Sequence, residues 1–230
     1  MVSKKIVVII PAFNEENSVG KVVNDIPKSI VSDIIVVNNN SNDLTKVNAL
    51  AASAIVVDEP MQGYGNACLK GMAFVSDMKK KPDIIVFIDA DYSDYPEEIE
   101  KLVKPILIEN FDMVIGSRAL GKRERGSMTP QQIFGNWLAT SLLKLFYNVS
   151  YTDLGPFRAI KYEKLLELEM IDKTYGWTVE MQLKAAKQKL KITEVPVTYR
   201  VRIGHSKVSG TVKGTVMAGY KIITTIFKYL

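Results

Sequence analysis

Short apolar runs alternate with amphipathic stretches along the first half of the chain. The apolar runs are continuous and rich in β-branched side chains, which predicts buried strands. They cover residues 6–10, 34–37, 54–57, 84–88 and 113–115. The stretches between them carry apolar residues at helical spacing, which predicts helices. These cover residues 15–26, 44–53, 65–78 and a segment from residue 96 that Pro105 is expected to disturb. Strands alternating with helices predict an α/β fold, with a Rossmann-like, mostly parallel sheet and helices on both faces.

The regular alternation ends after residue 117. Residues 118–130 are polar and lack periodicity, which predicts a mobile loop. Beyond this loop the pattern predicts one strand, 192–202, and helices over 131–146, 176–189 and 211–230. Since there is no internal repeat and no linker, we expect a single domain, 1–230, composed of an N-terminal half, 1–117, and a C-terminal half, 118–230.

The charges of this chain of 230 residues are unevenly distributed around a formal net charge of +5. Acidic residues gather around 89–100, whereas 117–125 and 199–213 are basic, which favours anionic ligands. We find no zinc-ligand spacing, aromatic RNA-binding run or basic recognition helix, so no nucleic-acid partner is expected. The single cysteine, Cys68, excludes an intramolecular disulfide and fits a reducing compartment such as the cytoplasm.

We next consider which segments could direct the chain to a membrane or bind one. The first apolar run is interrupted by Pro11 and is too short for a signal-peptide core. No stretch approaches the about 20 apolar residues that a membrane-spanning helix needs. The predicted C-terminal helix places Lys213, Lys221 and Lys228 beside its apolar positions, which fits either an anionic membrane surface or packing on the domain. We therefore expect a cytoplasmic protein, soluble or peripheral at the cytoplasmic face of a membrane.

Two carboxylates follow the predicted strand over 84–88. Alternate residues of an extended chain point the same way, so Asp89 and Asp91 can converge on one point beyond the strand end. Such paired hard oxygen ligands suit Mg²⁺ or Mn²⁺. The alternative is an acidic turn that caps the next helix, since the residues 94–97 resemble a helix start.

Polar side chains also follow the other strands of the predicted sheet. Pro11 ends the first strand, after which Phe13 offers a ring for stacking on a base and Glu15 offers a hydrogen-bond acceptor. Asn38 and Asn39 end the second strand. In open α/β sheets ligands bind beyond the carboxyl ends of the strands. Each segment taken alone can also be a turn or a helix cap.

Taken in order, these strand ends resemble glycosyltransferase family 2. The resemblance lies in the segments PAFNEE (11–16), VNNNSNDLT (37–45), GYGNA (63–67) and DADYSDYPEE (89–98). It implies a GT-A fold, an inverting reaction on nucleotide-diphospho sugars, and a divalent metal, Mg²⁺ or Mn²⁺, on Asp89 and Asp91. It implies that half 1–117 binds the nucleotide sugar through Pro11, Phe13, Glu15, Asn38, Asn39, Gly63, Asp89, Ala90 and Asp91. The family more often has Asp-Asp where this chain has Asn38-Asn39, which leaves the base open.

The second half is similar to polyprenyl-phosphate sugar synthases, such as the dolichyl-phosphate mannose and glucose synthases. The resemblance lies in GSR (116–118), DLGPFR (153–158) and YRVRIGHSK (199–207). It implies an acceptor-side half, 118–230, which includes the predicted C-terminal amphipathic helix. Cations that meet the phosphates are expected from Arg118, Arg123, Arg125, Arg202 and Lys207. Two departures are Gly155-Pro156, where the synthases often have Ser-Gly, and Ser93, where many mannose synthases have Gln.

These resemblances imply transfer of a hexose, from UDP-glucose or next from GDP-mannose, to a polyprenyl or dolichyl phosphate. The catalytic residues would be Asp91, Arg118 and Arg202, because an ionised phosphate attacks without a general base. A soluble hydroxyl acceptor would need one, and Glu180 is the candidate, unless it is an exposed helix carboxylate. Its neighbour Trp177 fits either stacking on a sugar or the core. A non-catalytic nucleotide-sugar-binding protein is the alternative of another class. The sequence leaves open the oligomeric state, a homodimer included.

Overall fold

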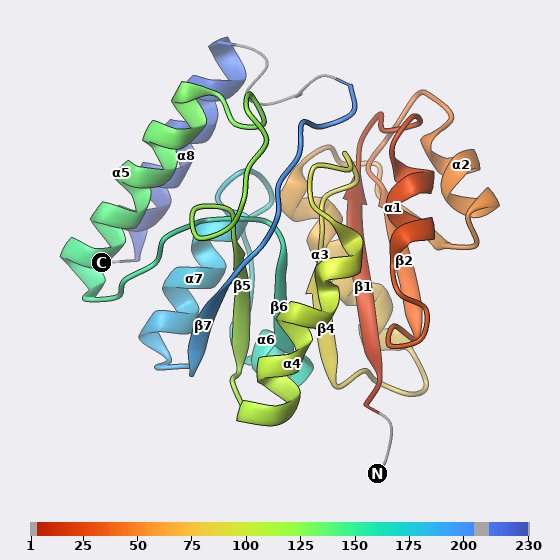
Figure 1. Ribbon diagram of the computed structural model, residues 1–230, viewed down its shortest axis with the longest axis horizontal. Coiled ribbons are helices and arrows are strands. Elements are labelled where there is room, and N and C mark those ends of the chain that lie inside the picture. Colours follow the sequence, from red (N-terminus) through yellow and green to blue (C-terminus); the bar gives the residue numbers. More distant parts are fainter. Residues whose placement is uncertain (1–3, 205–211, 230) are drawn as a thin grey trace.

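A seven-stranded sheet forms the centre of the computed structural model, which describes residues 4–204 and 212–229 (Figure 1). Its strands are β1 (Ile6–Ala12), β2 (Asp33–Asn38), β3 (Ile55–Asp58), β4 (Ile84–Phe87), β5 (Met113–Ser117), β6 (Arg158–Lys161) and β7 (Ile192–Pro196). They are ordered β3-β2-β1-β4-β6-β5-β7. Only β6 runs antiparallel to its neighbours, β4 and β5. The predicted mostly parallel α/β sheet is therefore confirmed.

Helices cover both faces of this sheet (Figure 1). One face packs against α1 (Val19–Asp25), α2 (Thr45–Ala51) and α4 (Ile99–Glu109), which follows a short 3₁₀ helix, η1 (Pro96–Glu98). The other face packs against α3 (Tyr64–Asp77), α6 (Tyr162–Glu167) and α7 (Trp177–Lys187). The remaining helices, α5 (Pro130–Tyr147) and α8 (Val212–Lys228), lie side by side and pack with α7 around a separate apolar cluster.

The period of two along β1 explains why both faces need helices. Val8 and Ile10 belong to the core under α1 and α4, whereas Val7 and Ile9 belong to the core under α3 and α7. All these side chains are fully buried. A strand that buries both of its faces reads as a continuous apolar run, as residues 6–10 do.

The strand topology brings distant segments to one edge of the sheet. The carboxyl ends of the parallel strands β1, β2 and β4 lie together there, because their registers pair Ala12 with Asn38 and Ile9 with Phe87. The antiparallel strand β6 begins at this same edge, since Arg158 pairs with Phe87. The residues before β6 therefore reach the strand ends that carry the candidate ligands.

The predicted strand over 192–202 is wrong beyond Pro196. β7 pairs only with β5, and this pairing ends where Ser117 meets Pro196, so no partner strand continues the ladder. The chain then crosses over the carboxyl ends of the strands as an irregular segment. Tyr199 forms isolated bridges there with Asp94 and Arg123.

Three other predictions about elements need correction. The first helix starts at Val19 instead of residue 15, because residues 16–18 form turns. Pro105 does not interrupt α4, which continues to Glu109 because its apolar face is buried on the sheet. β6 and α6 were not predicted at all. Residues 118–130 are irregular up to the start of α5, as predicted, and their mobility stays a prediction.

Candidate active site

A pocket of about 380 Å³ lies at the carboxyl ends of β1, β2 and β4. Nearly every residue that the sequence analysis assigned to the nucleotide sugar lines it: Pro11, Phe13, Glu15, Asn39, Gly63, Asp89, Ala90 and Asp91. Residues that the sequence analysis did not select complete the lining, among them Tyr64, Tyr175 and Gln62. We call this cavity the donor pocket.

The two asparagines at the end of β2 have different environments. Asn38 does not line the donor pocket, because its side-chain amide donates to the Asp58 carboxylate at 2.9 Å. Asn39 faces the pocket, and its amide also fixes the pocket wall. Its Nδ2 donates to the Met61 carbonyl at 2.8 Å, and its Oδ1 accepts the N–H of Gly63 at 2.8 Å. Nδ2 also donates to the Glu59 carbonyl at 3.1 Å, so only Oδ1 can accept a further hydrogen bond. Of the two residues predicted to read the base, only Asn39 lines the pocket.

Beside Gly63, the backbone at the start of α3 lies in close contact with the backbone of residues 172–173. Gly63 has a φ of +148°, and a Cβ there would lie 2.3 Å from the carbonyl oxygen of Lys173. A Cβ at Gly65 would lie 2.0 Å from the carbonyl oxygen of Asp172. The turn over residues 171–174 can approach the start of α3 only because both positions are glycine. The Gly-rich segment thus gives this wall its shape.

Asp89 and Asp91 follow β4, and both line the donor pocket. Asp91 Oδ1 accepts hydrogen bonds from the N–H of Ser93 at 2.9 Å and from its hydroxyl at 2.6 Å. Asp89 Oδ1 is buried and has no hydrogen-bond partner. Burial, together with the negative charge of Asp91, raises the pKa of Asp89 to about 7. The Asp89 carboxylate forms no direct ion pair within the described residues, although the charges of Arg202 and Arg118 lower its pKa in part.

The residues present fit a divalent cation. A buried carboxylate oxygen without a donor is what a metal ion would satisfy, and paired carboxylates suit Mg²⁺ or Mn²⁺. No cluster of three or more acidic, histidine or cysteine ligands exists within residues 4–204 and 212–229. Two protein carboxylates leave the other coordination positions to a diphosphate and to water, as is common for Mg²⁺.

Arg202 joins the carboxylate pair to the donor pocket. Its Nη1 lies 3.1 Å from Asp91 Oδ2, and its Nη2 lies 2.9 Å from Glu15 Oε1. The sequence predicted an arginine near the reacting phosphates, but it did not predict that Arg202 pairs with both Asp91 and Glu15. The pairing depends on the irregular segment after β7, which returns to the end of β4.

Arg118, which follows β5, is held by an acidic partner that the sequence did not reveal. Its Nε and Nη2 contact the two carboxylate oxygens of Asp153 at 2.8 and 2.6 Å. Although burial disfavours a charged carboxylate, Arg118 holds the pKa of Asp153 below its usual range. The Asp153 side chain also accepts the backbone N–H of Arg118 at 2.7 Å. This bidentate geometry fixes the guanidinium beside the site.

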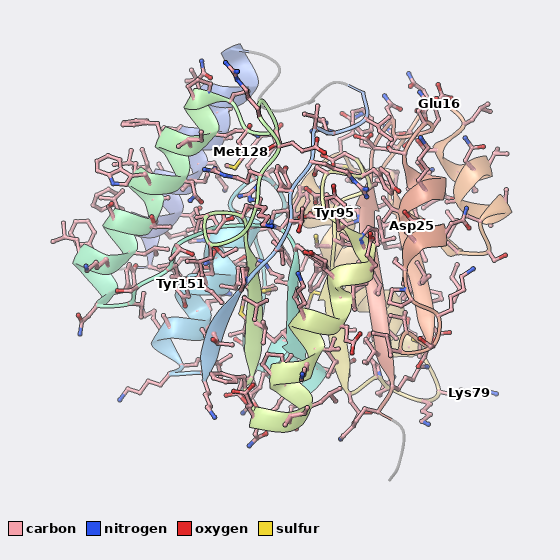
Figure 2. All side chains as sticks on the ribbon, viewed as in Figure 1. Glu16, Asp25, Lys79, Tyr95, Met128 and Tyr151 are labelled. Carbon is pink, nitrogen blue, oxygen red and sulfur yellow. The ribbon has the colours of Figure 1, made fainter. Side chains whose placement is uncertain are left out.

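A second, larger cavity of about 870 Å³ continues from the donor pocket. The two cavities share five lining residues: Tyr64, Asp89, Asp91, Tyr175 and Arg202. Away from this shared end the lining comes largely from α5 and α8. It includes Met128 (labelled in Figure 2), Phe134, Leu138, Ala218, Ile222 and Ile223. We call this largely apolar space the acceptor cavity.

The structure contradicts the selection of Glu180 as a well-placed base. Glu180 is fully buried in α7 and lines neither cavity. Its carboxylate accepts the N–H of Asp172 at 2.8 Å and the hydroxyl of Tyr229 at 2.7 Å, and it pairs with Lys184 at 2.9 Å. The alternative of an exposed helix carboxylate is equally wrong. Trp177 is also fully buried and packs edge-on against Phe87, so it belongs to the core.

The remaining predicted cations are not gathered at the site. Arg123 and Arg125 are exposed on the 118–130 segment and line neither cavity. The Arg123 guanidinium instead contacts the sulfur of Met128 at 3.2 Å. Lys207 lies outside the described residues. Of the predicted acceptor residues, the structure therefore brings Arg118 and Arg202 to the acceptor cavity.

The site thus combines a pocket that carries two carboxylates with a larger, mostly apolar cavity at the edge of an α/β sheet. The family model of glycosyl transferase family 2 matches residues 7–168. The chain belongs to this family, and the protein is a glycosyltransferase. The predicted GT-A fold is thereby confirmed.

The chain is similar over nearly its whole length to transferases that act on lipid phosphates. The UDP-N-acetylglucosamine–dolichyl-phosphate N-acetylglucosaminyltransferase of Methanococcus voltae is 30% identical, covering 96% of this chain and 94% of that protein. The undecaprenyl-phosphate mannosyltransferase of Micrococcus luteus is 28% identical, covering 91% and 90%. The solved structure of glucosyl-3-phosphoglycerate synthase from Mycobacterium tuberculosis, with Mn²⁺, UDP and phosphoglyceric acid, has a TM-score of 0.78 at 22% identity and covers 98% of this chain and 78% of that one.

Proposed function

We propose that this glycosyltransferase transfers a hexose from a nucleotide-diphospho sugar to a polyprenyl phosphate and inverts the anomeric carbon. One observation carries the proposal: the apolar cavity between α5 and α8 ends at the same carboxylates and arginine that line the donor pocket. A lipid chain fits an apolar cavity, and its phosphate would then reach the charged end.

The charges of the acceptor cavity favour a phosphate as the attacking group. Its only acidic lining residues are Asp89 and Asp91, and no histidine lines it within the described parts of the chain. A hydroxyl acceptor requires a general base, whereas an ionised phosphate does not. Arg118 and Arg202 are the cations at this end. Each is paired with carboxylates in the structure, and we propose that their remaining N–H groups also meet the entering phosphate.

The donor would lie in the donor pocket, with its diphosphate toward Asp89 and Asp91. A bound Mg²⁺ or Mn²⁺ on these carboxylates would neutralise charge that develops on the departing nucleoside diphosphate. Phe13 offers a ring to the base and Asn39 a pocket-facing amide. We retain UDP-glucose as the first donor to test and GDP-mannose as the next. One of the similar transferases is named for a UDP-sugar donor and another for the transfer of mannose.

The acceptor side also presents an apolar surface to solvent. Phe134 and Trp137 on α5 are each 60% exposed, and Tyr220 on α8 is 64% exposed. None of the helices in the described parts of the chain is long and apolar enough to cross a membrane. We propose that this surface of α5 and α8 rests on the cytoplasmic face of a membrane, from which the lipid phosphate enters.

The proposal is tested by incubating the protein with UDP-glucose or GDP-mannose, Mn²⁺ and a short polyprenyl phosphate. The expected product is a glycolipid that partitions into organic solvent and is absent with EDTA. Asp91→Asn should lower turnover by about a hundredfold or more, because it weakens charge stabilisation at the leaving group. The matched control Asp77→Asn, an exposed position at the end of α3, should match the wild type.

Each competing function predicts a different product. A sugar product that stays in the aqueous phase with a hydroxyl acceptor would refute the lipid-phosphate assignment. Stabilisation by a nucleotide sugar without any turnover would indicate a binding protein. A thermal-shift panel of UDP, GDP and CDP sugars with and without Mn²⁺ identifies the donor, since a ligand that binds the native state raises the melting temperature.

A further inference from the structure

A third cavity, of about 430 Å³, lies outside the catalytic region. It is formed by the turn over residues 171–174 and by the last turns of α8. It shares no lining residue with the donor pocket or the acceptor cavity. α8 separates the spaces: Ile222 and Ile223 face the acceptor cavity, whereas Lys221 and Lys228 line the third cavity.

The lining of this cavity is strongly basic. Lys173, Lys221 and Lys228 line it, and Asp172 is the only acidic side chain among the described residues that do. Asp172 is already paired with Lys221 at 2.9 Å. Neither Lys173 nor Lys228 forms an ion pair within residues 4–204 and 212–229, and the Lys228 ammonium lies 5.4 Å from the ring centre of Tyr229. Two lysines of the cavity therefore carry uncompensated charge.

Neighbouring acidic groups do not supply the missing negative charge. Glu180 lies beneath the turn, but its carboxylate is committed to the backbone of Ile171 and Asp172, to Tyr229 and to Lys184. The uncompensated charge thus stays on the cavity side. Two lysines without ion-pair partners on one cavity favour a ligand with more than one negative charge. The volume suits a compact ligand instead of a polymer.

We propose that this cavity is a binding site for a phosphate monoester, separate from the donor and acceptor sites. Lys173 and Lys228 would donate charge-assisted hydrogen bonds to the phosphate oxygens, while the Lys221–Asp172 pair holds α8 against the turn. A phosphate monoester occurs both in soluble metabolites and in the headgroup of phosphatidic acid. The site is defined by this shared chemistry.

The test compares two double variants of equal charge. Lys173→Ala/Lys228→Ala removes the uncompensated charges and leaves Lys221 in place. Lys79→Ala/Lys80→Ala is the control, since both lysines are exposed and Lys79 lies at the far end of the molecule from α8 (Figure 2). Glycerol 3-phosphate binding is measured by calorimetry, and retention on phosphatidylcholine vesicles with and without phosphatidic acid by sedimentation.

The expected result is a loss of about tenfold or more in affinity for one probe in the cavity variant, with the control unchanged. Loss of glycerol 3-phosphate binding assigns the site to a soluble phosphomonoester. Loss of retention by phosphatidic acid assigns it to a lipid headgroup. Equal binding of both probes by the wild type and both variants would overturn the proposal. Phosphate bound at the catalytic arginines contributes equally to all three proteins and does not affect the comparison.

Discussion

Replacing Glu180 with glutamine removes a buried negative charge on which four donors converge. The donors are the N–H groups of Ile171 and Asp172, the hydroxyl of Tyr229 and the ammonium of Lys184. Glutamine keeps one carbonyl oxygen but turns an N–H₂ group toward groups that are themselves donors. Because removing one partner of a buried ion pair costs about 3–5 kcal/mol, we expect a loss of about 3 kcal/mol for this near-isosteric change.

This loss translates into a large thermal effect. For a domain of this size, each kcal/mol shifts the melting temperature by about 2–4 °C, so Glu180→Gln should melt about 6–12 °C below the wild type. The control Glu167→Gln removes an exposed ion pair with Lys164, where the glutamate side chain is 51% accessible. It should change the melting temperature by no more than about 1 °C, because such surface pairs contribute little.

The same variant separates a structural role from a catalytic one. Melting is followed by circular dichroism, and turnover is measured with UDP-glucose and polyprenyl phosphate at a temperature where all proteins are folded. Since Glu180 lines neither cavity, turnover should stay within about threefold of the wild type. Loss of a general base typically lowers the rate by about 10²–10⁴-fold. An unchanged melting temperature with such a loss of turnover would refute the structural role and revive the hydroxyl acceptor.

Further predictions follow from three positions near the donor pocket. Mn²⁺ must displace a proton from Asp89, whose pKa is about 7, so Mn²⁺ affinity measured by titration should rise about tenfold per pH unit below pH 7 and level off above it. Gly65→Ala should weaken UDP binding about tenfold or more in calorimetry, because its Cβ would meet the Asp172 carbonyl oxygen at 2.0 Å; unchanged affinity would contradict this. The buried Asp94 carboxyl has no hydrogen-bond partner, and burial raises its pKa. The wild-type protein therefore loses stability as pH rises, because ionising the buried Asp94 carboxyl is unfavourable in the folded state. Asp94→Asn should melt at a higher temperature than the wild type at pH 8 and at the same temperature below about pH 4.

The sequence located the donor pocket through local patterns. Buried parallel strands read as continuous apolar runs, so each strand end was visible, and ligands of open α/β sheets lie at those ends. Asp89 and Asp91 were selected because alternate residues of an extended chain share a direction. In the structure β4 ends at Phe87 and Asp91 lies in the turn that follows, so this turn also contributes to bringing both residues to the pocket. Local patterns also showed that residues 118–130 break the alternation. They did not show β6, since four residues with a charged residue at each end carry too little signal.

Tertiary contacts decided how each selected side chain is used. Arg118 and Arg202 were selected as cations, but only the fold showed that they face Asp153, Asp91 and Glu15, which are distant in sequence. Glu180 looked accessible and the place of Trp177 stayed open, because helical spacing does not reveal what packs on a helix. The turn at 171–174 and Tyr229 bury Glu180 completely.

By itself, therefore, the sequence determined the α/β fold, the family and the carboxylate pair, because strand period and motif order are properties of consecutive residues. The acceptor cavity between α5 and α8, the role of Glu180 and the basic cavity at Lys173 and Lys228 were decided by the tertiary structure. The two cavities join segments that are far apart in the sequence, and Glu180 is enclosed by the distant Tyr229 together with the nearby backbone of Asp172. These contacts are fixed by how the whole sheet and its helices pack and not by any local pattern.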